Sequence, residues 1–122
     1  MPIFRRWTEQ LKQVGATEDG AGSWGEYSVT ISSGAITITQ PGVYTVTPES
    51  GAADELTTIN GGLSGYEIWL LAADSTNTIT VKHGSDNIQT GYDFALDHKY
   101  DALRLLKHSD GNWIGGGIND NS

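Results

Sequence analysis

A period-two alternation of apolar and polar residues most restricts the fold of this chain. The alternating runs are 27–32 (YSVTIS), 36–39 (ITIT), 43–47 (VYTVT) and 78–82 (TITVK). Turn-forming pairs such as Ser33-Gly34 and Pro41-Gly42 separate them. Because side chains of a strand point alternately to its two faces, these runs predict half-buried strands joined by tight turns.

Residues 56–81 form the centre of this pattern and hold its most apolar run, 66–73 (YEIWLLAA). Both faces of that run are mainly apolar, which predicts a strand covered on both sides. In a small domain the second cover can come from another copy of the chain. The residues we assign to such a subunit interface are Tyr66, Ile68, Trp69, Leu70 and Leu71.

Length and composition agree with a small β-protein. The 122 residues fit one domain, with 16 glycines and only 18% charged residues. We therefore expect an all-β fold of nine or ten short strands. The predicted architecture is a compact antiparallel sandwich or a jelly-roll or barrel-like domain, preceded by a short helical or extended N-terminal arm.

The N-terminal arm, residues 1–25, differs from the rest of the chain. Residues 3–14 have the apolar spacing of one helix face, and a glycine-rich linker follows. Such a short helix must bury its apolar face, either on its own body or in a partner or further copies. The residues we assign to anchoring on a partner are Ile3, Phe4, Arg5, Arg6, Trp7, Leu11 and Trp24. The β-domain is expected at 26–114 and a loose tail at 115–122.

The charge balance restricts the partners. The formal net charge is −8. The first twelve residues hold three basic residues and one acidic residue, and the remaining 110 hold four basic and fourteen acidic. An acidic body repels nucleic acid and anionic membranes, so we expect neither as a partner. The chain has no cysteine, no signal-peptide pattern and no apolar run near the roughly 20 residues of a membrane span.

No residue pattern points to catalysis, a metal or a cofactor. His83, His98 and His108 lack a metal-ligand spacing and are predicted to lie at the surface. The carboxylates Asp86, Asp93, Asp97 and Asp101 are predicted to be solvated turn residues. No G-x-S-x-G sequence is present, and the glycines do not form a phosphate-binding loop.

The four tryptophans divide into two groups. Trp69 is predicted to pack in the core or at the subunit interface, and Trp113 is predicted to cover one end of the β-domain. Trp7 and Trp24 lie outside that domain, which favours contact with another chain.

Residues 54–114 carry motifs that resemble a module of tailed-bacteriophage structural proteins, including head fibres, capsid decoration proteins and tail-fibre tips. The motifs are a glycine turn at 60–62, an apolar strand at 68–73, T-I-x-V-K at 78–82, G-x-x-N-I at 84–88, a leucine strand at 103–106 and D-G-x-W at 110–113. These motifs are made of structural positions, and they carry no residues with an assigned chemical role.

The resemblance implies a non-enzymatic virion protein that forms a homotrimer. The short chain favours a place on the head, as a decoration or head-fibre protein bound to the major capsid protein through the arm. The alternative is a tail-fibre tip or small tail protein that binds a host-surface glycan through loops 84–91 and 109–113. A glycan-degrading enzyme is a third and weaker hypothesis.

Overall fold

The computed structural model describes residues 25–121, which form eleven β-strands and no helix. In chain order these are β1 (Gly25–Thr30), β2 (Ala35–Ile38), β3 (Gly42–Thr47), β4 (Ala53–Leu56), β5 (Thr58–Gly61), β6 (Glu67–Ala72), β7 (Thr78–Val81), β8 (Ile88–Gln89), β9 (Phe94–Leu96), β10 (Ala102–Lys107) and β11 (Trp113–Asn119). The all-β class is confirmed. Over this range there is no helix long and apolar enough to cross a membrane.

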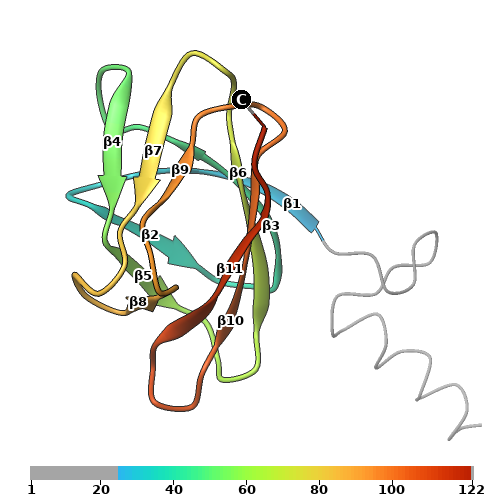
Figure 1. The fold of residues 1–122 in the computed structure, drawn as a ribbon. Helices are drawn as coiled ribbons and strands as arrows, with labels where there is room; N and C mark the ends of the chain where they lie inside the picture. Colours follow the sequence, from blue (N-terminus) through green and yellow to red (C-terminus); the bar gives the residue numbers. More distant parts are fainter. Residues whose placement is uncertain (1–24, 122) are drawn as a thin grey trace, which may run out of the picture.

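The strands form three sheets around one core (Figure 1). The largest has six strands in the order β1-β3-β6-β10-β11-β8, the second pairs β2 with β5, and the third has the order β4-β7-β9. Consecutive strands mostly lie in different sheets. The chain therefore winds around the core and returns to the same sheet one layer further along, a solenoid-like stacking.

Register partners show the length of one coil. Gly42 of β3 pairs with Ile68 of β6, 26 residues later, and Ala53 of β4 pairs with Thr78 of β7, 25 residues later. The first coil is shorter, since Gly25 pairs with Gly42 after 17 residues. The unequal coils explain why no internal repeat is visible in the sequence.

Most strand pairs are parallel, which corrects the antiparallel arrangement expected from the sequence. Five of the eight pairings are parallel. The three antiparallel pairs are β6 with β10, β10 with β11, and β7 with β9. Period-two alternation is the same for both directions. The predicted turn at Pro41-Gly42 is a corner between two sheets, because β2 and β3 belong to different sheets.

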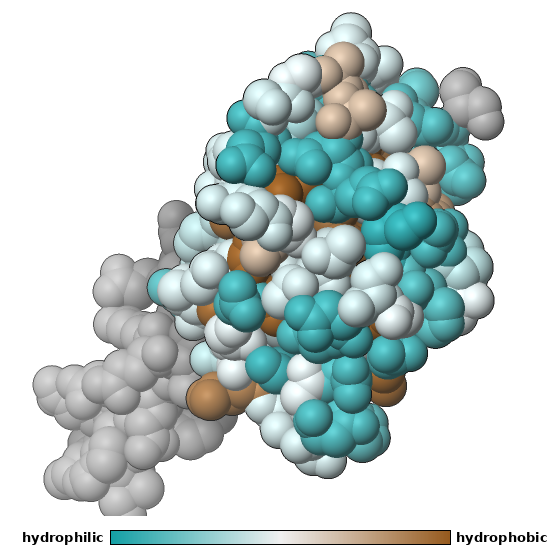
Figure 2. Space-filling model, turned by 90° about the vertical axis from the view of Figure 1, so that its left-hand side faces the viewer, coloured by the Kyte–Doolittle hydropathy of each residue, from teal (hydrophilic) through white to brown (hydrophobic). Residues whose placement is uncertain are grey.

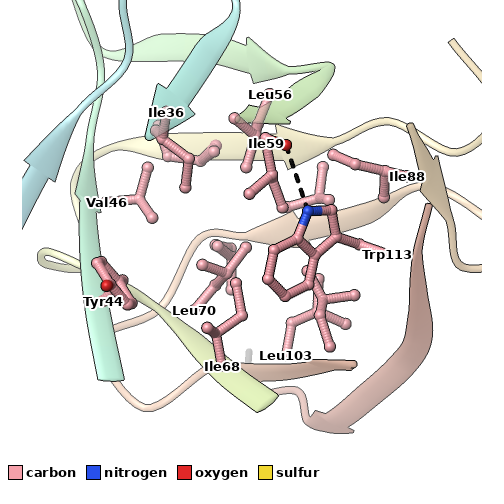
Figure 3. Packing of buried hydrophobic residues seen from close by; sticks show 14 of the residues in the cluster. Ile36, Tyr44, Val46, Leu56, Ile59, Ile68, Leu70, Ile88, Leu103 and Trp113 are labelled. Carbon is pink, nitrogen blue, oxygen red and sulfur yellow. Dashed lines mark hydrogen bonds between the residues drawn. The ribbon is translucent and has the colours of Figure 1, made fainter. Parts of the chain in front are cut away.

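The core consists of the inward side chains of all three sheets. In the six-stranded sheet, Tyr44 of β3 lies beside Leu70 of β6, which lies beside Leu103 of β10. All three are 2% exposed or less. Trp113 is fully buried among such residues, and its indole Nε1 donates a hydrogen bond to the carbonyl oxygen of Ile59 at 3.3 Å (Figure 3).

The C-terminal residues 115–119 are part of β11, so the predicted loose tail is wrong for them. Their backbone pairs with β10, with Gly115 opposite Leu105 and Gly117 opposite Leu103. Gly115 has a φ of 152°, and a Cβ there would collide with the carbonyl oxygen of Arg104. Glycine here permits the close approach of two strands instead of signalling a loop.

Asn87 takes the place of a strand beside β5. Its side chain accepts a hydrogen bond from the N–H of Ile59 at 3.0 Å and donates one to the carbonyl of Ile59 at 2.7 Å. Its own carbonyl accepts the N–H of Trp113 at 2.7 Å. Asn87 thus satisfies both backbone groups of Ile59 through its side chain and joins β5 to β11 through its own carbonyl.

Replacing Asn87 by alanine should destabilise the fold by about 2 kcal/mol or more, since a buried backbone group without a partner costs roughly 1–3 kcal/mol. The N–H of Ile59 would lose its acceptor. Urea unfolding followed by far-UV circular dichroism measures the change. Asn60→Ala is the control, because Asn60 is exposed at the end of β5; equal losses for both variants would contradict the assignment.

Candidate interaction surface

The outer face of the six-stranded sheet carries two of the five exposed large apolar residues of 25–121. We define it by the side chains of β3, β6, β10 and β11 that point away from the core. Register places Val43 beside Trp69, and Trp69 beside Arg104. The apolar residues of this face are Val43, Trp69, Leu71, Ala102, Leu106, Ile114 and Ile118.

Exposure on this face rises toward β11. Leu106 is 38% exposed and Ile118 is 57% exposed, and both belong to the few exposed large apolar residues among 25–121. A shallow cavity of about 200 Å³ lies between them, lined by Arg104, Leu106, Ile114, Gly115, Gly116 and Ile118. Gly116 has no side chain to fill it. The face is therefore apolar and hollowed.

Charge is scarce on the same face. Of the twelve acidic residues in 25–121, ten lie outside the strands of the six-stranded sheet. The two within it are Glu26 and Glu67, and Glu67 Oε2 forms an ion pair with Arg104 Nε at 2.7 Å. Figure 2 views the molecule from the side of β4 and β2 and shows mainly hydrophilic residues there. Most of the acidic residues thus lie on loops, on turns and in the smaller three-stranded sheet.

The structure divides the predicted subunit-interface residues into two groups. Trp69 and Leu71 point outward and are half-buried, so they remain candidates for contact with another copy. Ile68 and Leu70 are 0% exposed and lie in the chain's own core, so their assignment to an interface is wrong. Tyr66, just before β6, packs partly against that core. β6 alternates inward and outward like the other strands, and two of its three outward residues, Trp69 and Leu71, are apolar.

Three carboxylates meet where the chain enters β10. Oxygens of Asp97, Asp101 and Asp120 lie within 4.8 Å of one another. Asp101 is fully buried, which corrects the prediction of a solvated turn residue. Its carboxylate accepts the N–H groups of Asp97 at 2.9 Å, His98 at 3.0 Å and Asn121. Asp101 thereby clamps the turn before β10 to the end of β11.

The pKa values of this cluster shift in opposite directions. Burial raises the pKa of Asp101, but the three backbone N–H groups outweigh it and hold that pKa below its usual value. The hydrogen bond with Asp101, desolvation and the charges of Asp101 and Asp120 raise the pKa of Asp97. A proton on Asp97 therefore relieves repulsion within the cluster.

The histidines are at or near the surface and bond to the backbone. Nδ1 of His83 accepts the N–H of Gly91 at 2.9 Å, and Nδ1 of His98 accepts that of Tyr100 at 3.1 Å. Nδ1 of His108 accepts the N–H of Asp110 at 3.2 Å. Each imidazole thus holds a turn.

The two remaining predicted carboxylates are also engaged. Asp93 accepts the N–H of His83 and pairs with Lys82 at 3.0 Å. Asp86 accepts the hydroxyl of Thr58 at 2.7 Å. Both are exposed, as predicted.

The predicted anchoring residues, from Ile3 to Trp24, lie outside the described residues. Asn87 and Asp101 were not recognised from the sequence as structural centres. In the sequence, Asn87 and Ile88 stand out only as part of the G-x-x-N-I motif at 84–88.

Comparison with known proteins gives no match: no family model, curated protein or solved structure is similar to this chain.

Ionisation of Asp97 lowers the stability of the fold as pH rises to neutral, and replacing Asp97 by asparagine should remove this loss. Because the folded-state pKa of Asp97 is raised, its contribution is fully present below the unfolded pKa of about 4 and is lost as pH rises through the folded value. Asparagine carries no charge. The free energy of unfolding of the variant, measured between pH 4 and 7, should fall less than that of the wild type; an identical profile would contradict the coupling.

Replacing Asp101 by asparagine should have the opposite effect. The lowered pKa of Asp101 stabilises the fold above the unfolded pKa of about 4, and this stability is lost as pH falls through the folded value. An amide cannot accept all three N–H groups, so we expect a loss of about 2 kcal/mol or more at neutral pH. Urea unfolding of the Asp97→Asn and Asp101→Asn variants at pH 7 measures the free energy of unfolding of each and compares them directly.

Proposed function

We propose that this protein is a non-enzymatic structural protein of a tailed-bacteriophage virion. It is a capsid decoration or head-fibre protein that attaches to the particle, through the major capsid protein, by its N-terminal arm, residues 1–25. Copies of the chain associate as a homotrimer on the virion. The resemblance of residues 54–114 to phage structural modules is the starting point of this proposal.

The use of the polar side chains in the β-body is the observation that carries the proposal. The carboxylates and imidazoles with the chemistry for catalysis hold the backbone instead: Asp101 accepts three N–H groups and each histidine accepts one. Asn87 and Asp93 do the same for β5 and for the turn after β7. A body whose polar groups hold its own backbone suits a mechanical role.

The position of the arm supports its anchoring role. Residues 1–14 hold three basic residues and one acidic one, whereas residues 25–121 hold four basic and twelve acidic. The arm joins the body at β1, the edge strand of the six-stranded sheet. Attachment there leaves the rest of the body free to project from a particle.

The mechanism of such a protein is binding linked to assembly. A protein that binds only the assembled shell stabilises it by mass action. The stabilisation per site is RT ln(1 + [L]/Kd), where [L] is the concentration of the free binding protein and Kd is its dissociation constant. Basic side chains of the arm would add electrostatic attraction to an acidic partner surface. Many bound copies would then together stabilise the assembled shell.

Two exposed tyrosines favour a second candidate function, a tail-fibre tip or small tail protein that binds a host-surface glycan. Tyr92 is 48% exposed and Tyr100 is 61% exposed, and such rings can stack on sugars. Tyr92 directly follows the proposed binding loop 84–91. Trp113 is fully buried, so the loop at 109–113 would bind without it.

Deleting residues 1–14 should abolish capsid binding and leave the β-body folded. The body has its own core of eighteen buried apolar residues, all within 31–113. The measurement is co-sedimentation with purified heads, with far-UV circular dichroism as the folding check. Replacing Arg5 and Arg6 by glutamine should weaken binding in full-length protein, and Lys99→Gln is the matched control in the body.

Full occupancy of heads by the truncated protein would contradict the anchoring assignment. The number of copies per particle separates the two functions: a decoration protein is expected in hundreds of copies, as an order of magnitude set by shell symmetry, and a tail tip in only a few. A screen against host surface polysaccharide tests the second candidate, and an absence of binding would exclude it.

A further inference from the structure

The outer face of the six-stranded sheet requires a cover that residues 25–121 do not supply. We infer that a second copy of this chain covers it. This inference deepens the self-association in the proposed function by giving it a surface, and it does not depend on attachment to a capsid.

The first argument is the apolar character of this face. Leu106 and Ile118 are exposed on neighbouring strands, and half-buried Ile114 lies opposite Leu106. Half-buried Trp69 and Leu71 lie on β6, and the Arg104–Glu67 ion pair lies among these apolar residues. Exposed apolar residues gathered on one face mark an interaction site, whereas isolated ones do not. Aromatic and aliphatic residues with little charge are also the composition of an interface centre.

The second argument is charge, and it selects the occupant. Two copies of a chain with net charge −8 repel each other over most of their surfaces. The outer face avoids this repulsion, because Glu67 is neutralised by Arg104 and ten of twelve acidic residues lie outside the sheet's strands. Residues 3–14 of the arm are the other available apolar segment. Their basic residues favour an acidic surface, and this face is not one.

The third argument is shape. The cavity of about 200 Å³ is partly open, and its lining consists of the apolar side chains of Leu106, Ile114 and Ile118 together with Arg104, Gly115 and Gly116. A Cβ at Gly116 would contact only the hydroxyl of Tyr92, at 3.8 Å. The cavity gives room for an aliphatic side chain of the neighbouring copy. Such a fit gives the contact its specificity.

The test uses full-length protein with a charge placed on the face. We expect the wild type to sediment as a closed assembly of two or three copies at micromolar concentration, and Leu106→Lys and Ile118→Lys to raise the dissociation constant on the order of tenfold or more. Leu63→Lys is the control: Leu63 is 67% exposed in the loop between β5 and β6 and should assemble as the wild type does. Unchanged circular dichroism confirms folding.

An independent measurement uses the absence of cysteine. Leu106→Cys introduces the only thiol, and its alkylation should slow as protein concentration rises, whereas that of Leu63→Cys should not. A monomeric wild type at micromolar concentration, or lysine variants that assemble normally, would overturn the inference. Failure of the full-length wild type to bind heads, with assembly retained, would count against the proposed function alone.

Discussion

The hydrogen bonds between Asn87, Ile59 and Trp113 allow a parallel stack of strands to end. Each coil leaves an open edge that needs either another coil or a substitute. On β5 the Asn87 amide bonds both backbone groups of Ile59, and the Trp113 indole adds a bond to the same carbonyl. Trp113 belongs to β11, so this contact also fixes the C-terminal hairpin, β10–β11, across the end of the core (Figure 3).

Other polar side chains also hold the backbone through hydrogen bonds. Asp101 holds the turn before β10 and the end of β11 through three backbone N–H groups, and the histidines hold turns. Charge is placed on turns, loops and smaller sheets, leaving one neutral apolar sheet face. An acidic body with one such face agrees with the self-association that we propose, and the basic residues at 5, 6 and 12 agree with the proposed anchoring role of the arm.

Parts of the candidate surface were predictable and parts were not. The apolar run 66–73 marked β6, and Trp69 and Leu71 do lie on its outer face. Ile68 and Leu70 were predicted for the same surface because a run apolar on both sides does not show which set points inward. Leu106, Ile114 and Ile118 join the face only through strand pairing. Asp101 resembled its exposed neighbours because burial depends on the distant Asn121.

The sequence by itself determined the all-β class, the positions of most strands and the turns between them. Alternation and turn residues are local properties, so they can be read along the chain. Only the tertiary structure decided which strands pair, in which direction and around how many sheets. Parallel and antiparallel neighbours need the same alternation, and the glycines at 115–117 serve a close strand approach as readily as a loop. Pairing is a contact between residues far apart in sequence, and local patterns do not encode their partners.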